Sequence, residues 1–186
     1  MHEPLALPIH YNHLVQGAIY NSIDTELAEF LHNKGFAVNG RSFKMFAFST
    51  LNGAFKIDKE KSTITFMSGI RLVITSPVDE FCQSLVNALL KRGTLRLGKQ
   101  VLEIVDINLV KPQRTTGEVL LRTLSPVVLY STLLRPDGRK YTAYFQPGDP
   151  DHERLLGENL RKKYRAFFRE EPPPDDIRVR PKGMQR

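Results

Sequence analysis

Apolar side chains between positions 14 and 31 recur at intervals of three and four residues, the pattern of a helix with one buried face. The positions that carry the pattern are Leu14, Ala18, Ile19, Ile23, Leu27, Phe30 and Leu31. Gly35 follows with Lys34 beside it, which is typical of a helix C-terminus. Residues 21–24 include three types that often cap helix N-termini. Segment 13–34 is therefore predicted to form two short helices with a break between them.

The break matters for two polar residues, Tyr20 and His32. In one straight helix they would lie about 18 Å apart along the axis and differ by about 120° around it. They could not then share a site. A break at 21–24 allows the second helix to fold back, and we expect it to bring His32 towards Tyr20.

Alternation of apolar and polar residues predicts strands over much of the following sequence. We expect strands at 43–49, at 54–57 and 63–67 around the charged turn 58–61, at 70–75 and at 101–109. A further helix is expected to have Ser76 as its N-cap, Pro77 at its first position and Gly93 at its end. Residues 1–8 give no clear strand signal. One strand added before the first helix would complete a ferredoxin-like βαββαβ unit.

The polar stretch 111–117 is the best boundary between two parts of the chain, so the predicted domains are residues 1–111 and 117–186. In the second part we expect extended structure at 118–134, a turn at 135–138 and a strand at 140–145. A helix is expected at 149–168, because its apolar residues fall on one stripe. Three prolines at 172–174 end it, and 177–180 is a candidate last strand.

Several runs of residues in this order resemble a known family. The runs are LPIHYNHLVQGAIY (7–20), LAEFLH (27–32), FKMFAFS (43–49), IRLVITSP (70–77), LSPVVLY (124–130) and ENLRKKYRAF (158–167). Together they resemble the CRISPR-associated endoribonucleases of the RAMP superfamily, which cut repeat RNA into guide RNAs. The resemblance covers most of residues 7–168.

The resemblance implies an α+β fold with tandem ferredoxin-like (RRM-like) units. In the family, the second unit continues with another strand, a helix, a glycine-rich loop and a closing strand. We therefore expect a first unit that lacks a clear first strand, and a second unit that is truncated at its C-terminal half.

Composition and charge indicate which class of partner the protein binds. The 186 residues carry a formal net charge of +7, which suggests a polyanion such as nucleic acid, although a basic surface without such a role is the alternative. A single cysteine excludes an intrachain disulfide. Neither a signal pattern nor a long apolar run is evident, so a soluble, cytoplasmic protein without a membrane partner is expected.

If the substrate is RNA, the ribose 2′-OH can act as the nucleophile, and neither a metal nor another cofactor is needed. The reaction then requires a base, an acid and a cation near the phosphate. His32 is the candidate acid or base. Tyr20 is the candidate for orienting the 2′-OH or the phosphate, and Lys44 is the candidate cation. The alternatives are a histidine that complements a helix dipole, a tyrosine at the edge of the core and a solvated strand lysine.

The candidates for RNA phosphate contacts are Arg41, Arg71, Lys91, Arg92, Arg96, Arg114 and Arg122, and the alternative for each is a solvated surface residue. The resemblance implies products with 2′,3′-cyclic phosphate and 5′-hydroxyl ends. The predicted function is thus metal-independent cleavage of CRISPR repeat RNA. The alternative is a RAMP-type subunit that binds repeat RNA without cutting it. Expected partners are this RNA and either a second copy of the chain or a CRISPR effector complex.

Overall fold

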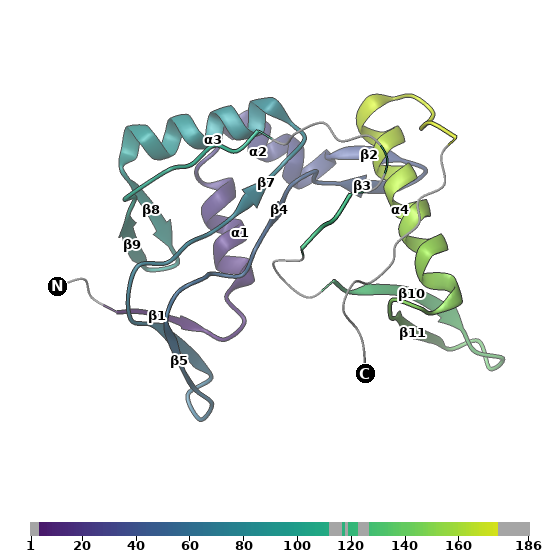
Figure 1. Cartoon of the computed structure of the whole chain (residues 1–186), viewed down its shortest axis with the longest axis horizontal. Coiled ribbons are helices and arrows are strands. Elements are labelled where there is room, and N and C mark those ends of the chain that lie inside the picture. Colours follow the sequence, from purple (N-terminus) through teal and green to yellow (C-terminus); the bar gives the residue numbers. More distant parts are fainter. Residues whose placement is uncertain (1–3, 112–116, 118, 123–126, 175–186) are drawn as a thin grey trace. The chain divides into compact units, whose positions relative to one another are not determined.

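The computed structural model describes residues 4–111, 117, 119–122 and 127–174, which combine helices with short antiparallel strands in an α+β fold (Figure 1). Contacts divide the chain into two compact units. Unit 1 comprises Met1–Gly35 and Lys44–Leu124, and unit 2 comprises Phe36–Phe43 and Ser125–Arg186. The division into residues 1–111 and 117–186 stays a prediction.

Unit 1 is built around a small antiparallel sheet and three helices. Its elements are β1 (Leu5–Pro8), α1 (Asn12–Tyr20), α2 (Thr25–Glu29), the π-helical turn η1 (Phe30–Lys34), β4 (Ala47–Phe48), β5 (Phe55–Asp58), β6 (Thr63–Phe66), β7 (Ile74–Thr75), α3 (Asp79–Arg92), β8 (Thr94–Leu97) and β9 (Gln100–Glu103). The sheet has the order β1–β6–β5. These are the first, third and second strands of a ferredoxin-like unit, and the predicted hairpin is confirmed as β5 and β6.

The chain does have a first strand, although residues 1–8 carry no clear strand signal. Leu5 pairs with Phe66 of β6, and Leu5 and Leu7 are buried. The strand is only four residues long and ends at Pro8. A proline is tolerated there because β1 is an edge strand of its sheet.

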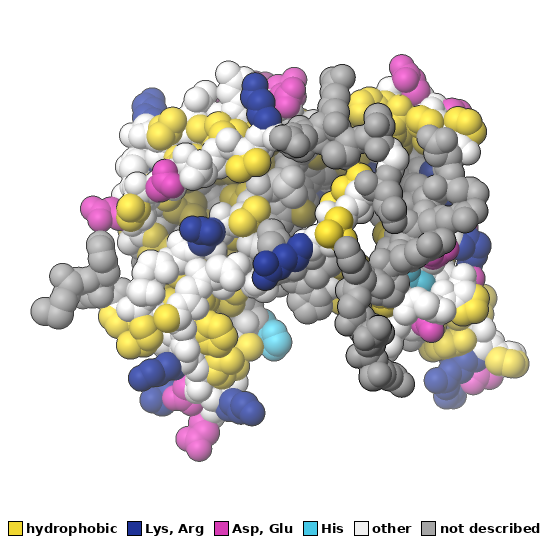
Figure 2. Space-filling model, in the orientation of Figure 1, with side chains coloured by type: hydrophobic (Ala, Val, Ile, Leu, Met, Phe, Trp, Pro, Cys, Tyr) yellow, Lys and Arg dark blue, Asp and Glu magenta, His cyan; other side chains and the backbone are white. Residues whose placement is uncertain are grey.

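The core of unit 1 lies between the helices and this sheet. Its most deeply buried large side chains are Val15, Ile19, Leu31, Phe66, Phe81 and Leu97. α1 and α3 both pack against β8. At the edge strand β5 this same face is less well covered, since Phe55 and Ile57, which pair with the buried Phe66 and Ile64, are about half exposed. Figure 2 shows this hydrophobic surface, with charged side chains at the tip of the β5–β6 hairpin.

Three expected elements of unit 1 differ in the structure. The strand at 43–49 is interrupted because Met45 has a positive φ of 53°, which an extended strand cannot accommodate. The strand at 70–75 is reduced to β7 and one isolated bridge at Arg71. In place of the long strand at 101–109, the chain forms the β8–β9 hairpin, which turns at Gly98 with φ 62°.

The start of α3 also differs from expectation. The helix begins at Asp79 with Val78 as its N-cap residue, and Ser76 lies outside it. The Ser76 hydroxyl accepts a hydrogen bond from Val78 N at 3.0 Å and donates one to the Met45 carbonyl at 2.7 Å. The expected end at Gly93 is confirmed, with φ 64° at that glycine.

Unit 2 consists of two hairpins and one long helix. Its elements are β2 (Phe36–Val38), β3 (Arg41–Phe43), β10 (Leu129–Leu134), β11 (Lys140–Phe145) and α4 (Pro150–Phe168). α4 packs on β2, β3 and β10 (Figure 1), and the rings of Phe36 and Phe167 lie 5.3 Å apart. The predicted strand at 140–145 and helix at 149–168 are confirmed. The candidate strand at 177–180 lies outside the described residues.

Candidate active site

Tyr20 and His32 come together in unit 1. Tyr20 is the last residue of α1, and His32 lies in the π-helical turn that follows α2. Their ring centroids are 5.7 Å apart, with an interplanar angle of 77°. The predicted break between two helices is confirmed, and it brings the two side chains to one place as expected.

The break is held by specific hydrogen bonds. The Asp24 carboxylate caps α2 by accepting hydrogen bonds from Glu26 N at 3.0 Å and Leu27 N at 3.4 Å. The Asp24 N–H donates to the Ser84 hydroxyl of α3 at 2.7 Å, which fixes the start of α2 on a second helix. Asp24 thus sets the direction of the segment that carries His32.

The turn that holds His32 is a π-helix, a rare geometry that is frequent at functional sites. Its closing hydrogen bond runs from Gly35 N to the Phe30 carbonyl at 2.6 Å. Gly35 has φ 64° and ψ −167°, a backbone conformation that is open essentially to glycine alone. The sequence signals give the end of this segment at Gly35 but not its π-helical form.

The Tyr20 hydroxyl is buried and has no hydrogen-bond partner among the described residues. The ring packs edge-on against both His32 and Phe46, whose centroid is 5.5 Å away. Burial raises the pKa of Tyr20 above its ordinary value, and a polar contact with the Gln16 side chain, which falls short of hydrogen-bond geometry, lowers the pKa by less. Tyr20 is therefore protonated at neutral pH, and it can donate a hydrogen bond but cannot serve as a base.

The His32 imidazole is exposed and oriented by its neighbour. Its Nδ1 lies 2.9 Å from Asn33 Oδ1. An amide oxygen can only accept a hydrogen bond, so Nδ1 carries a hydrogen atom and donates the hydrogen bond to Asn33. In the neutral ring Nε2 is then the atom with a free lone pair, and this atom can take up or release a proton.

Lys44 joins the same cluster through the backbone. Its Nζ donates a hydrogen bond to the His32 carbonyl oxygen at 2.5 Å. Lys44 directly precedes Met45, whose carbonyl oxygen accepts the hydrogen bond from Ser76 described above. The structure therefore brings all three candidate side chains into one region of unit 1.

A pocket of about 620 Å³ opens beside Tyr20 and His32. Its lining residues are His13, Gln16, Gly17, Tyr20, Asn21, Ile23, Thr25, Ala28, Glu29, His32, Asn33 and Arg92. The polar side chains of Gln16, Asn21 and Asn33 are contributors that the sequence patterns did not single out. Sequence signals mark them only as helix-surface or cap residues.

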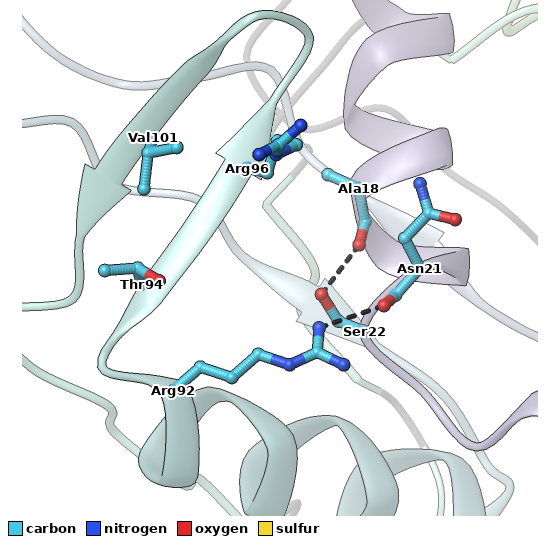
Figure 3. A pocket seen from close by; sticks show the side chains of 7 residues that line it. All are labelled: Ala18, Asn21, Ser22, Arg92, Thr94, Arg96 and Val101. Carbon is cyan, nitrogen blue, oxygen red and sulfur yellow. Dashed lines mark hydrogen bonds between the residues drawn. The ribbon is translucent and has the colours of Figure 1, made fainter.

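A second pocket of about 370 Å³ adjoins the first, and Asn21 and Arg92 line both. It lies between the ends of α1 and α3 and the β8–β9 hairpin (Figure 3). Arg92 Nη1 donates to the Asn21 carbonyl oxygen at 3.0 Å, and Arg96 of β8 also lines the pocket.

The remaining RNA-binding candidates are dispersed. Arg41 belongs to β3 of unit 2, Arg71 lies at an isolated bridge, and Lys91 is in the last turn of α3. Arg122 is exposed, and Arg114 lies outside the described residues. Of these candidates, the structure brings only Arg92 and Arg96 to one described pocket.

The described residues offer no group of three or more His, Cys, Asp or Glu side chains that could hold a metal ion. His13 Nδ1 lies 2.9 Å from the His10 carbonyl oxygen. Over the same residues, no helix combines the length and apolar character needed to cross a membrane.

The structure thus defines an α+β protein in which a histidine and a tyrosine line one pocket, a lysine contacts the histidine backbone, and an adjoining pocket holds two arginines. Two family models match the chain: "CRISPR-associated protein Cas6, N-terminal" over residues 6–108 and "CRISPR associated protein Cas6, C-terminal" over residues 109–186. Because the first match alone covers more than half of the chain, the protein belongs to the Cas6 family of CRISPR-associated proteins. The predicted family is confirmed.

Relatives agree with this assignment. The CRISPR-associated endoribonuclease Cas6 1 of Methanocaldococcus jannaschii is 28% identical, and the match covers 96% of this chain and 70% of the relative. A solved structure of a CRISPR-associated protein Cas6 is also 28% identical, with a TM-score of 0.65, and the match covers 92% of this chain and 69% of that one.

Two further solved structures show the fold alone, since each is only 20% identical. The product of a Cas6-related gene from Pyrococcus furiosus has a TM-score of 0.73, with 92% of this chain and 69% of that chain covered. A RAMP protein described as binding different RNA substrates has a TM-score of 0.66, and the match covers 91% of this chain and 71% of that chain. The expected ferredoxin-like α+β fold is confirmed.

Proposed function

We propose that this protein is an endoribonuclease that cuts CRISPR repeat RNA through the ribose 2′-OH, without a metal ion. The observation that carries the proposal is the convergence of Tyr20 and His32, 5.7 Å apart between ring centroids, with Lys44 bound to the His32 backbone. Membership of the Cas6 family and the likeness to a CRISPR-associated endoribonuclease support RNA as the substrate.

In the proposed reaction, the 2′-oxygen forms a bond to phosphorus while the bond from phosphorus to the 5′-oxygen breaks. The 2′-OH loses its proton to a base, and the departing 5′-oxygen gains one. The products are a 2′,3′-cyclic phosphate and a 5′-hydroxyl, so the atoms balance without water or a protein nucleophile. Each proton transfer needs a side chain that can accept or donate a proton at the reacting oxygen.

His32 is the residue suited to one of these transfers. Its exposed ring has Nδ1 engaged by Asn33, which leaves Nε2 for the substrate. General acid–base catalysis by a positioned side chain contributes about 10²–10⁴-fold to a rate. We assign His32 as acid or base on this ground.

Tyr20 and Lys44 are assigned supporting roles at the phosphate. The phenol is protonated at neutral pH and its residue lines the pocket, so it can donate a hydrogen bond to the 2′-oxygen or to a phosphate oxygen once RNA binding uncovers the buried hydroxyl. The Lys44 ammonium is a compact positive charge beside His32, where negative charge would build up on the phosphorane.

A single-turnover assay on a repeat RNA tests the proposal. Cleavage should persist in EDTA, should stop when the scissile nucleotide is 2′-deoxy, and should fall by about 10²–10⁴-fold in His32→Ala. His10→Ala is the matched control, because it removes an exposed histidine that does not line the pocket. Loss of cleavage in EDTA, or unchanged cutting of the 2′-deoxy substrate, would contradict the mechanism.

The same assay addresses the alternative, a subunit that binds repeat RNA without cutting it. A specific observation keeps this alternative in view: the Lys44 ammonium already donates to the His32 carbonyl, and Lys44 is not among the residues that line the pocket. Tight RNA binding with no cleavage between pH 5 and 9 would favour the binding function over the nuclease.

A further inference from the structure

The 370 Å³ pocket at the end of α1 has a composition suited to an anion. Its lining residues are Ala18, Asn21, Ser22, Arg92, Thr94, Arg96 and Val101, and none of them carries a carboxylate. Two guanidinium groups therefore face one small space without a negative partner lining it. Like charges repel each other, and an anion bound between them would relieve that repulsion.

The two arginines differ in how they are held. Arg92 spans from the last turn of α3 to the Asn21 carbonyl oxygen (Figure 3), a bond that uses one of its five N–H donors. Its position at a helix C-terminus is by itself favourable, so Arg92 alone would not indicate a ligand.

The position of Arg96 is not explained by a helix C-terminus or by a hydrogen bond. It lies on β8, opposite Val101 of β9, and has no hydrogen-bond or ion-pair partner among the described residues. Its guanidinium can form paired hydrogen bonds to phosphate oxygens, which is the geometry that distinguishes arginine from lysine. The Thr94 hydroxyl is a further polar group of the same lining.

This pocket continues into the one beside Tyr20 and His32, since Asn21 and Arg92 line both. An RNA strand that runs through the two joined pockets would pass both the Tyr20–His32 pair and the two arginines. We propose that Arg92 and Arg96 form a subsite for the backbone phosphate of the nucleotide next to the cleaved bond. The position of this phosphate rests on the proposed function, whereas its binding can be measured without cleavage.

The test uses repeat RNA that is 2′-deoxy at the cleavage site, so that binding is measured without turnover. Each phosphate near the cut is replaced in turn by an uncharged methylphosphonate. Affinities are compared for the wild type, Arg96→Ala, Arg96→Lys and the control Lys56→Ala, which removes an exposed positive charge from β5 outside either pocket. Arg96 is varied because the loss of Arg92 would also break its bond to Asn21.

We expect Arg96→Ala to weaken binding about tenfold and to reduce the slope of log affinity against log salt by about 0.7. Arg96→Lys should keep the salt slope but recover only part of the affinity. A methylphosphonate at one position next to the cut should weaken RNA binding by the wild type about as much as Arg96→Ala does. The same methylphosphonate should cause no further loss of affinity in Arg96→Ala. Lys56→Ala should bind like the wild type.

Three results would overturn the subsite. The first is an equal affinity of Arg96→Ala and Lys56→Ala for the RNA. The second is that each methylphosphonate weakens Arg96→Ala as much as it weakens the wild type. The third is coupling of Arg96 to any phosphate other than one adjacent to the cleaved bond. Cleavage of the matching 2′-OH RNA is measured in parallel. If cleavage is absent but one phosphate is coupled to Arg96, the nuclease proposal fails and the phosphate site stands. If cleavage is normal and no phosphate is coupled to Arg96, the proposed phosphate subsite is wrong and the nuclease proposal stands.

Discussion

Replacing Tyr20 by phenylalanine should make the protein more stable and less active. The substitution keeps the ring that packs edge-on against His32 and Phe46 and removes only the hydroxyl. That hydroxyl is buried with only a polar contact to Gln16 in place of a well-formed hydrogen bond, and a buried group left unsatisfied costs about 1–3 kcal/mol. Part of the gain is offset by the small void left behind, so we expect the free energy of unfolding to rise by about 1 kcal/mol. In a chain of this size, Tm would increase by about 2–4 °C.

The same substitution should slow cleavage by about 10²–10³-fold, the usual effect of removing one hydrogen-bond donor from a developing negative charge. Urea unfolding and single-turnover cleavage measure the two effects on the same samples. A hydroxyl with a purely structural role would give the opposite result, a loss of stability with unchanged cleavage. That outcome would refute the assignment of Tyr20 as an unpaired donor kept for the substrate.

The pH dependence of stability gives a second check on Tyr20. Burial raises the pKa of the phenol, so above pH 10 the folded protein retains a proton that the unfolded chain has released. The wild type should therefore lose stability as pH rises above about 10, the ordinary pKa of tyrosine. Tyr20→Phe has no such proton, and its stability advantage should widen over that range. An advantage that stays constant through pH 10–11 would argue against a buried phenol.

Two further substitutions test the support of His32. Lys44→Ala removes both the charge and the bond to the His32 carbonyl, and it should slow cleavage by about 10²-fold while changing stability by under about 1 kcal/mol, because the bond is exposed. An unchanged single-turnover rate would exclude a role at the phosphate. Asp24→Ala removes the α2 cap and should cost about 1 kcal/mol in urea unfolding and also reduce cleavage, whereas Asp24→Asn should restore both. Restored stability without restored cleavage would show that the cap is not what positions His32.

Local signals in the sequence were sufficient for several elements. The cap-forming residues at 21–24 predicted the break between α1 and α2, and the apolar stripe at 149–168 predicted α4. The β5–β6 hairpin followed from alternation around a charged turn. These features depend on interactions between residues close in the chain, so a pattern over a few positions is enough to indicate them.

The β2–β3 hairpin is not among the expected elements, although the sequence carries a local signal for it. Asn39 and Gly40 both have positive φ, of 47° and 74°, and Asn-Gly is the strongest short hairpin signal in a sequence. This signal predicts a strand end at residue 43, which separates β3 from the segment expected as a strand at 43–49. The positive φ of Met45 carries no comparable signal, because a long-range hydrogen bond from Ser76 to the Met45 carbonyl helps to hold it.

The sequence by itself determined the α+β class, the positions of the long helices, the basic character and the residue types able to act on RNA. Only the tertiary structure decided that Tyr20, His32 and Lys44 lie together and that Arg92 and Arg96 share a pocket. The physical reason is that hydrophobic spacing reports which face of an element is buried. The meeting of polar side chains depends instead on hydrogen bonds between distant segments, such as Asp24 to Ser84 and Arg92 to Asn21.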